Sequence, residues 1–309
     1  MKKILTVTFS PALDKSTSVE NIVPDHKLRC TEPVFEPGGG GINVSRALKK
    51  LGCDSIAIYA KGGYTGTMLK QLLDEEEIIQ HPINTQRPTR ENFIVVENAT
   101  NLQYRYGMPS PELSVDEVKM FMDAFRSYED VGYIVVSGST PKGVTSDFFI
   151  QLSGYCFSNG IKLIGDTSGQ MLKTMIQHGV YLIKPNFKEL CELSGKDIKN
   201  VNEQVEAAQK ILSDYSVHII VVSLGASGAM LVSSNEVHHV GAPSVKRKST
   251  VGAGDSMVAG MVYALVHGWP LQEVLKFGIA CGSAATMNSG TQLCKKQDVE
   301  LLYNWLKQQ

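Results

Sequence analysis

The sequence predicts a three-layer α/β fold, in which helices cover both faces of a mostly parallel central sheet. Over most of the 309 residues, short strand-like runs alternate with amphipathic helical runs. Two runs, YIVVSGS (133–139) and IIVVSLG (219–225), are apolar and end in serine and glycine. Such runs are typical of strands buried in a parallel sheet whose carboxyl ends meet a ligand crevice. Hydrophobic residues make up 43% of the chain and charged residues 20%, as in an ordinary globular protein.

The first strand is expected at 3–9, where Leu5, Val7 and Phe9 alternate with two threonines at the period of a half-buried strand. The same reasoning places further strands at 54–60, 132–138, 161–165, 180–183 and 217–222. Helices are expected at 42–51, 65–76, 114–127, 145–157, 202–213, 254–267 and 271–287.

Two stretches, 15–36 and 89–106, interrupt this rhythm because they resemble strands with no helix between them. We expect them to form a small antiparallel sheet that acts as a lid over the carboxyl edge of the main sheet. The length allows about two domains, or one large α/β domain with an elaboration. We therefore predict one domain over residues 1–309, with a β-sheet lid built from these insertions.

Charge and targeting signals exclude several classes of protein. The 30 basic and 31 acidic residues give a net charge of −1, which argues against a general nucleic-acid binder. No apolar run approaches the roughly 18 residues of a membrane helix, and the amino-terminal segment lacks the features of a signal peptide. The six cysteines are scattered without a CxxC or zinc motif. We expect a cytoplasmic protein with reduced thiols.

The first motif is FEPGGGGINVSRALKKLG (35–52), in which four glycines precede a predicted helix. Glycine lets backbone N–H groups approach a ligand closely, and a helix amino terminus favours anions. A dinucleotide fingerprint fails, because Asn43 and Val44 stand where its third glycine is required. The sequence also contains no Walker A motif. A flexible turn is the less favoured explanation of the glycines, and Asn43, one turn into the helix, is well placed to bind a sugar hydroxyl.

The second motif is STVGAGDSMVAGMVYAL (249–265), where Gly252, Ala253 and Gly254 precede an apolar helix. Asp255 lies in its first turn. A carboxylate there stabilises a helix dipole, but that role does not require the adjacent glycines. Together these residues suit phosphoryl transfer: the amides would hold developing charge and Asp255 would accept the proton of the attacking hydroxyl.

The third motif is LIKPNFKELCEL (182–193), in which Asn186 and Glu189 share one face of a predicted helix. Both suit a Mg²⁺ ion that keeps several waters, and Lys184 is placed to meet a phosphate. A capping box, with Asn186 at the N-cap and Glu189 three residues later, explains the same pair equally well.

Cations on the predicted lid suit a phosphorylated sugar, although each alone resembles an ordinary surface residue. They are Lys27, Arg29, Arg90 and Arg105. Asp14, after the first strand, would either hold sugar hydroxyls or begin a turn.

These motifs resemble, from end to end, the PfkB-type sugar kinases of the ribokinase-like superfamily. The match rests on GGGGINVSRAL (38–48), KPNFKE (184–189), VVSLGASGA (221–229) and the highly specific STVGAGDSM (249–257). A finer resemblance to the 6-phosphofructokinase branch of the bacterial minor-isozyme type rests on KLRCTEPVFEPGGGGINVSRAL (27–48), TREN (89–92), QYRYGMP (103–109) and SGTQLC (289–294). Gly40 and Gly41 stand where 1-phosphofructokinases and tagatose-6-phosphate kinases tend to have a lysine within GKGIN.

The resemblance implies a ribokinase-like sandwich whose β-lid pairs with that of a second subunit in a homodimer. It implies transfer of the ATP γ-phosphoryl group to O1 of fructose 6-phosphate in glycolysis, giving fructose 1,6-bisphosphate and ADP. The implied cofactors are Mg²⁺ with ATP, and K⁺.

The resemblance also assigns roles to residues. Asp255 is the implied base, and Gly252, Ala253 and Gly254 the anion hole. The implied substrate contacts are Asp14, Gly39, Gly40, Gly41, Asn43, Arg90, Arg105 and Ser139. The implied nucleotide contacts are Lys27, Lys184, Asn186, Ser223, Gly225, Gly228 and Ser283. Glu189 is the implied Mg²⁺ residue, acting through water. The implied monovalent-cation residues are Ser249, Val251, Ala285, Asn288 and Gly290. Arg247 replaces a serine near the nucleotide, so we expect that contact to differ.

Two alternatives stay open. One is a sister kinase acting on tagatose 6-phosphate or fructose 1-phosphate, which the Gly40–Gly41 pair disfavours. The other is a non-catalytic sugar or nucleotide sensor, which would be expected to lose Asp255 or the adjacent glycines.

Overall fold

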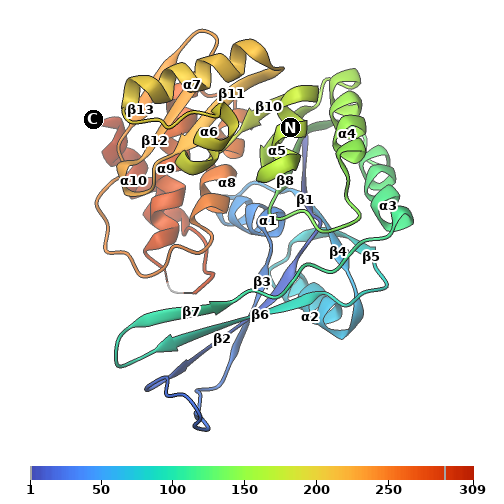
Figure 1. The fold of residues 1–309 in the computed structure, drawn as a ribbon, viewed down its shortest axis with the longest axis vertical. Helices are drawn as coiled ribbons and strands as arrows, with labels where there is room; N and C mark the ends of the chain where they lie inside the picture. The colour runs from blue at the N-terminus through green and yellow to red at the C-terminus, as the bar shows by residue number, and fades with distance from the viewer. Residues whose placement is uncertain (1, 289) are drawn as a thin grey trace.

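The computed structural model describes residues 2–288 and 290–309. Ser289, the first residue of the SGTQLC motif, lies outside these ranges, as does Met1. The body of the molecule contains one sheet of order β13-β12-β11-β10-β9-β8-β1-β4-β5 (Figure 1). Its strands are β1 (Lys3–Thr8), β4 (Ile56–Lys61), β5 (Ile79–Asn84), β8 (Val131–Ser137), β9 (Lys162–Asp166), β10 (Val180–Ile183), β11 (Val217–Ser223), β12 (Ala229–Ser233) and β13 (Val237–Val240).

Neighbouring strands from β5 through to β11 run parallel, whereas β12 and β13 are antiparallel additions at one edge. The side chains of the central strands are buried on both faces of the sheet. In β8, Ile134 and Val136 belong to one hydrophobic cluster, while Tyr133 and Val135 belong to the other. The predicted mostly parallel α/β sandwich is therefore confirmed.

Helices cover both faces of this sheet. They are α1 (Gly40–Leu51), α2 (Gly63–Glu75), α3 (Val115–Arg126), α4 (Ser146–Ser158), α5 (Gly169–His178), α6 (Phe187–Ser194), α7 (Val201–Asp214), α8 (Ala253–Val266), α9 (Leu271–Thr286) and α10 (Lys296–Lys307). A 3₁₀ turn, η1, spans Gly225–Ser227. Helices α1, α2, α8, α9 and α10 pack on one face, and α3 to α7 on the other. Within the described ranges, no helix is long and apolar enough to cross a membrane.

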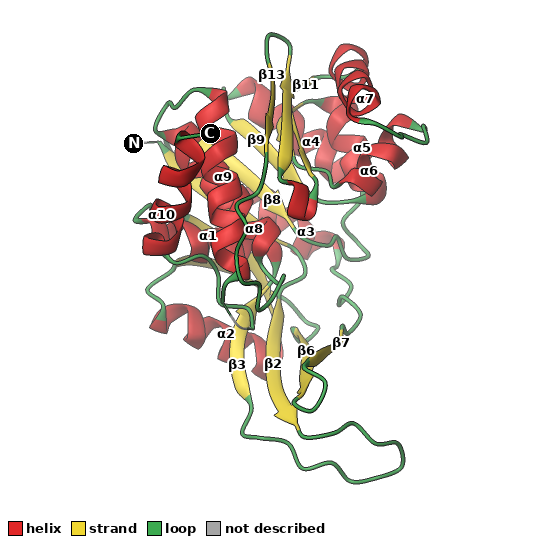
Figure 2. Cartoon of the chain, turned by 90° about the vertical axis from the view of Figure 1, so that its left-hand side faces the viewer, coloured by secondary structure: helices red, strands yellow, loops and turns green. Residues whose placement is uncertain are grey.

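The two insertions form a second sheet of order β3-β2-β6-β7, which stands out from the body in Figure 2. Its strands are β2 (Ala12–Val19), β3 (Val34–Gly38), β6 (Arg90–Glu97) and β7 (Leu102–Tyr106). We call these four strands and the loop 20–33 the lid.

The expectation of an antiparallel lid is wrong for its central pair, because β2 and β6 run parallel. The reason lies in how the chain enters the lid. Strand β2 continues outward from β1, and β6 continues outward from β5, two strands that both point toward this edge of the main sheet. Only the returning strands, β3 and β7, pair antiparallel.

Candidate active site

The carboxyl ends of the central strands bring polar side chains together with the first turns of two helices. Ser137 ends β8, Asp166 ends β9 and Lys184 follows β10. Parallel strands end at the same edge of a sheet, so these side chains converge on the side where the lid is attached. Asn43 of α1 and Asp255 of α8 reach the same place.

Asp255 is a half-buried carboxyl in the first turn of α8. The Asn43 amide nitrogen donates to its Oδ2 at 2.9 Å. Burial raises the pKa of Asp255 to about 6; the nearby Asp166 also raises it, whereas Asn43, Lys184 and the Ser137 hydroxyl act to lower it. A carboxyl with a pKa close to neutral pH suits a general base, because it is ionised in the working range and still accepts a proton readily.

Lys184 and Asp166 form a largely buried ion pair, with 3.0 Å between Nζ and Oδ1. Burial acts to lower the pKa of the Lys184 amine, but the charges of Asp166, Asp255 and Glu189 outweigh it and hold that pKa above its ordinary value. The Ser137 hydroxyl lies 3.2 Å from Asp166 Oδ2 and 3.5 Å from Asp255 Oδ1. Lys184 therefore carries a lasting positive charge beside two carboxyl groups.

The glycine run lies directly against these strand ends. A Cβ at Gly40 would lie 2.4 Å from Ser137 Oγ and 2.7 Å from the Gly138 nitrogen, so only glycine allows this approach. Gly39 adopts a positive φ of 118° at the N-cap of α1. Packing against the end of β8 therefore requires glycine at position 40, and the approach of these glycines to a ligand stays a prediction.

Asp14 of the lid strand β2 is another carboxyl of the site, and it is buried. The Asn92 amide donates to its Oδ1 at 2.8 Å. Burial raises the pKa of Asp14, while Asn92, Arg90 and Arg46 act against that rise. The Arg90 guanidinium donates to the carbonyls of Met108 (2.9 Å) and Ser10 (3.2 Å), but its buried Nε has no partner within the described chain. A buried guanidinium N–H without a partner is a candidate donor to an anionic ligand.

Three predicted ligand contacts lie on the exposed surface instead. Lys27 lies in the loop 20–33, and Arg105 on β7 donates to Gln103. Ser139 is exposed beyond Gly138, whose φ is 103°, and it is Ser137 whose hydroxyl reaches Asp255. Sequence reasoning missed both Ser137 and Asp166. The signal for Asp166 was a carboxylate at the end of an apolar strand, and for Ser137 a serine at the end of YIVVS.

Five of the predicted nucleotide residues lie at or just after the ends of β10 and β11: Lys184, Asn186, Ser223, Gly225 and Gly228. The Ser223 nitrogen donates to the Pro185 carbonyl at 3.0 Å, which places it beside the start of α6. Gly225 opens the turn η1, and Gly228 closes it with a φ of 91°. Ser283 lies buried on α9.

Asn186 and Glu189 form the capping box that the sequence allowed as one explanation. The Asn186 nitrogen donates to Glu189 Oε2 at 2.8 Å, and the Glu189 nitrogen donates to Asn186 Oδ1 at 2.9 Å. Glu189 still lies near enough to Lys184 to act on its pKa.

The five residues predicted to hold a monovalent cation lie on two adjoining segments. The Lys248 and Ser249 nitrogens both donate to the Thr286 carbonyl, and the Asn288 amide donates to the carbonyls of Ala284 and Leu293. In the described chain, no group of three or more His, Cys, Asp or Glu side chains could hold a metal ion. The donors offered here are hydroxyl, amide and carbonyl oxygens, which fit K⁺ better than a transition metal.

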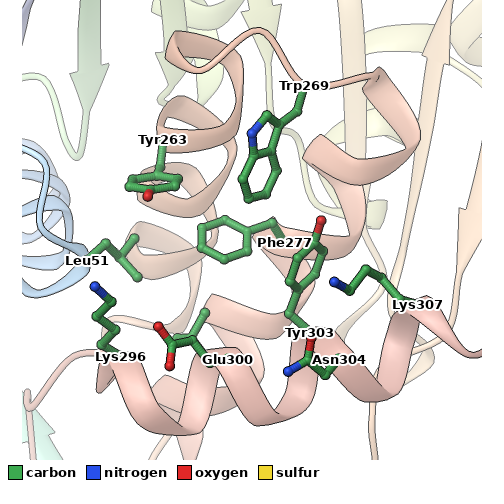
Figure 3. Close-up of a pocket in the computed structure, with 10 residues that line it drawn as sticks. Leu51, Tyr263, Trp269, Phe277, Lys296, Glu300, Tyr303, Asn304 and Lys307 are labelled. Carbon is green, nitrogen blue, oxygen red and sulfur yellow. The ribbon is translucent and has the colours of Figure 1, made fainter.

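A separate pocket of about 280 Å³ lies between α8, α9 and α10 (Figure 3). Its walls include Tyr263, Trp269, Phe277 and Tyr303. Tyr263 follows Asp255 by eight residues, or about 12 Å along α8. None of the predicted site residues lines this pocket.

The chain matches proteins of one family along almost its whole length. Residues 10–298 match the model of the "pfkB family carbohydrate kinase". The chain is 41% identical over 307 residues to the ATP-dependent 6-phosphofructokinase isozyme 2 of Escherichia coli, covering 99% of each. It is 32% identical to the 1-phosphofructokinase of Bacillus subtilis, covering 92% of this chain and 93% of that one.

Two solved structures have the same fold as this chain over nearly its whole length. The E. coli phosphofructokinase-2 in complex with potassium has a TM-score of 0.95 at 41% identity. The same enzyme in complex with fructose-6-phosphate has a TM-score of 0.94 at 40% identity. Each comparison covers 99% of this chain and 100% of the solved one.

Proposed function

The chain belongs to the pfkB family of carbohydrate kinases, and from that membership and the site we propose that it is an ATP-dependent 6-phosphofructokinase. It transfers the γ-phosphoryl group of ATP to O1 of fructose 6-phosphate, giving fructose 1,6-bisphosphate and ADP in glycolysis. The relative that is 41% identical along its length carries this activity in its name. The six free cysteines fit the reducing cytoplasm, where we expect it to act.

The observation that carries the proposal is the half-buried Asp255 carboxyl bonded to Asn43, in the first turn of a helix that begins with Gly252, Ala253 and Gly254. In the proposed step, O1 of the sugar forms a bond to the γ-phosphorus while the bond from that phosphorus to the β–γ bridging oxygen breaks. ADP leaves with the electron pair, and the O1 proton passes to an Asp255 oxygen. The amides at the start of α8 stabilise charge on the moving group.

The remaining site residues position the two substrates. Asp14, Asn43 and the glycine loop hold the sugar, and Arg90 offers its free Nε to the sugar phosphate. Lys184 meets the phosphates of ATP, and the 223–228 turn with Asn186 and Ser283 holds the nucleotide. Lys27, Arg105 and Ser139 stay predicted contacts from the exposed surface.

Two metal ions complete the proposal. Glu189 would hold Mg²⁺ through water, and Mg²⁺ shields the charge of the triphosphate. Ser249, Val251, Ala285, Asn288 and Gly290 would hold K⁺ beside the anion hole. A relative that was solved with potassium supports this second site.

We also propose that the protein is a homodimer that pairs through the lid. The outer strands of the lid expose Val34, Leu102 and Tyr106, which are large apolar side chains that a second lid would cover.

The test is a coupled assay of ADP release with MgATP and each of fructose 6-phosphate, fructose 1-phosphate and tagatose 6-phosphate. We expect kcat/KM to be highest for fructose 6-phosphate, and kcat to fall by at least about 100-fold in Asp255→Asn, while substrate binding is kept. A preference for another sugar would move the function to a sister kinase. ATP binding without any turnover would support a sensor.

A further inference from the structure

Arg46 is a buried arginine in α1 that touches three separate parts of the molecule. It is only 4% exposed. Its Nε and Nη2 donate to the two Glu76 carboxylate oxygens at 2.8 and 2.6 Å. Its Nη1 donates to the Pro37 carbonyl at 3.0 Å and, more weakly, to Asn43 Oδ1 at 3.4 Å. Arginine is rarely buried so fully, and here the bidentate pair with Glu76 compensates its charge.

These contacts connect the end of α2 to the residues around Asp255. Glu76 follows the last turn of α2, and Pro37 precedes the glycine run. Asn43 is the residue whose amide donates to Asp255. The Arg46 guanidinium therefore bonds to Glu76 at the end of α2 on one side. On the other side it bonds to Pro37, before the glycine run, and to the Asn43 amide.

The orientation of the Asn43 amide depends on this arrangement. Its Oδ1 faces the Arg46 donor and its Nδ2 faces the Asp255 carboxylate. In the flipped orientation, an amide oxygen would face a carboxylate and an amide N–H₂ would face a guanidinium, so both contacts would be repulsive. Without Arg46, only the Asp255 side would favour the observed orientation.

Arg46 also acts on Asp14, the buried carboxyl of the lid strand β2. Its charge and that of Arg90 favour the ionised form of Asp14, against the effect of burial and of Glu36. Glu36 stands directly opposite Asp14 on the neighbouring lid strand.

We propose that Arg46 is a positioning residue for phosphoryl transfer: braced by Glu76, it holds the Asn43 amide toward Asp255 and holds the Pro37–glycine segment against the sugar site. This inference rests on the proposed function of the same site.

The proposal predicts a specific kinetic signature. The groups that face Asp255 are Asn43 from α1, Ser137 from β8, Asp166 from β9 and Lys184 after β10. Loss of the Asn43 hydrogen bond removes an interaction that favours the ionised form, so the pKa of Asp255 rises. The acid limb of the kcat profile, which is the rise of kcat with pH as Asp255 loses its proton, then moves to higher pH. The KM for the sugar phosphate rises because the glycine loop is released, while the KM for ATP stays close to that of the wild type.

The test compares Arg46→Lys, Arg46→Met and the double variant Arg46→Met/Glu76→Gln with the wild type. Lysine keeps the charge but cannot make the bidentate pair and both remaining contacts at once. We expect each variant to lower kcat/KM for fructose 6-phosphate by about tenfold or more and to move the acid limb up by about half a pH unit. Lys49→Met, on the same helix as Arg46, is the matched control, because it breaks only an exposed ion pair with Asp54 beyond the end of α1.

The double variant separates positioning from folding. It leaves no unpaired charge, so its free energy of unfolding should recover toward that of the wild type, while the kcat profile and the sugar KM stay altered. If the free energy of unfolding and the kinetics of the double variant both return to wild-type values, the proposal is overturned. Wild-type kinetics in Arg46→Lys would overturn it as well.

A direct titration keeps the inference testable if the function is wrong. The carboxyl ¹³C shift of Asp255, assigned with Asp255→Asn, reports its pKa without any substrate. A wild type that fails to phosphorylate fructose 6-phosphate would sink the proposed function alone, whereas an unchanged Asp255 titration in Arg46→Met would sink the positioning role.

Discussion

Asp255 shows how one residue obtains its chemistry from opposed neighbours. Burial and Asp166 stabilise its protonated form, and Asn43, Lys184 and Ser137 stabilise its charged form. The balance leaves a pKa of about 6, well above the ordinary 3.8 of an aspartate. Below that pH the carboxyl holds a proton and cannot take one from the sugar hydroxyl.

We therefore predict that kcat rises with pH through about 6 and then levels off. Lys184→Met should move this limb to higher pH, because the positive charge that favours the carboxylate is gone. The measurement is kcat at saturating MgATP and sugar phosphate across this range. The residual activity of Asp255→Asn serves as the control, since it reports only the titration of the substrates. A wild-type profile parallel to that control would contradict the role of Asp255.

At the scale of elements, the first turn of α6 combines a structural and a chemical role. Asn186 and Glu189 cap the helix by reciprocal hydrogen bonds, and these bonds alone would justify both residues. Glutamine at position 189 keeps an acceptor for the Asn186 N–H, so it removes the charge and leaves the cap intact.

We predict that Glu189→Gln changes the free energy of unfolding by less than about 0.5 kcal/mol, whereas Asn186→Ala lowers it by about 1 kcal/mol. If Glu189 also organises Mg²⁺, the Mg²⁺ concentration for half-maximal activity should rise several-fold in Glu189→Gln. Glu117→Gln in the capping box of α3 is the control, because Glu117 caps another helix and is none of the predicted site residues. An equal Mg²⁺ requirement in both variants would reduce Glu189 to a helix cap.

The elements that the sequence predicts well are those with a strong period or a long apolar run, such as β1, β8 and α8. Strand β5 was missed because IQHPIN is polar, half-exposed and contains Pro82 at the edge of the sheet. Helix α10 was missed although Val299, Leu302 and Leu306 carry a helical period. The parallel pairing of β2 with β6 could not be predicted, because it depends on where distant strands leave the main sheet.

The same limit applies to the site. The glycine run, Lys184 and Asp255 stand out because their motifs are local in the sequence. Asp166 is a single carboxylate at the end of a strand, and only folding brings it beside Lys184. The glycine turn at 138 separates Ser137 from Ser139, and a strand period alone does not show which serine faces the site.

At the scale of the whole molecule, the lid exposes apolar side chains that the body does not cover. Val34 is 58% exposed and Leu102 is 56% exposed, on the two outer strands. A sheet with such edges favours a partner that covers them.

We predict that Val34→Glu/Leu102→Glu converts a dimer into a monomer, because two lids would then bring like charges together. Sedimentation velocity checks this, with Leu301→Glu as the control, since Leu301 is 69% exposed on α10 in the body. A wild-type monomer, or a dimer that survives both lid substitutions, would place the interface elsewhere or remove it.

The order of strands in the main sheet also constrains how the chain is assembled as the ribosome makes it. Strand β1 is made first and lies between β4 and β8, but β8 is complete only at Ser137. Strand β2 likewise waits for β6, which ends at Glu97. One edge of β1 therefore stays unpaired until Ser137 has been made, although β1, β4 and β5 can pair as soon as β5 ends at Asn84. The amino-terminal third can form the lid and one flank of the main sheet, but the sheet closes around β1 only after the middle third has emerged.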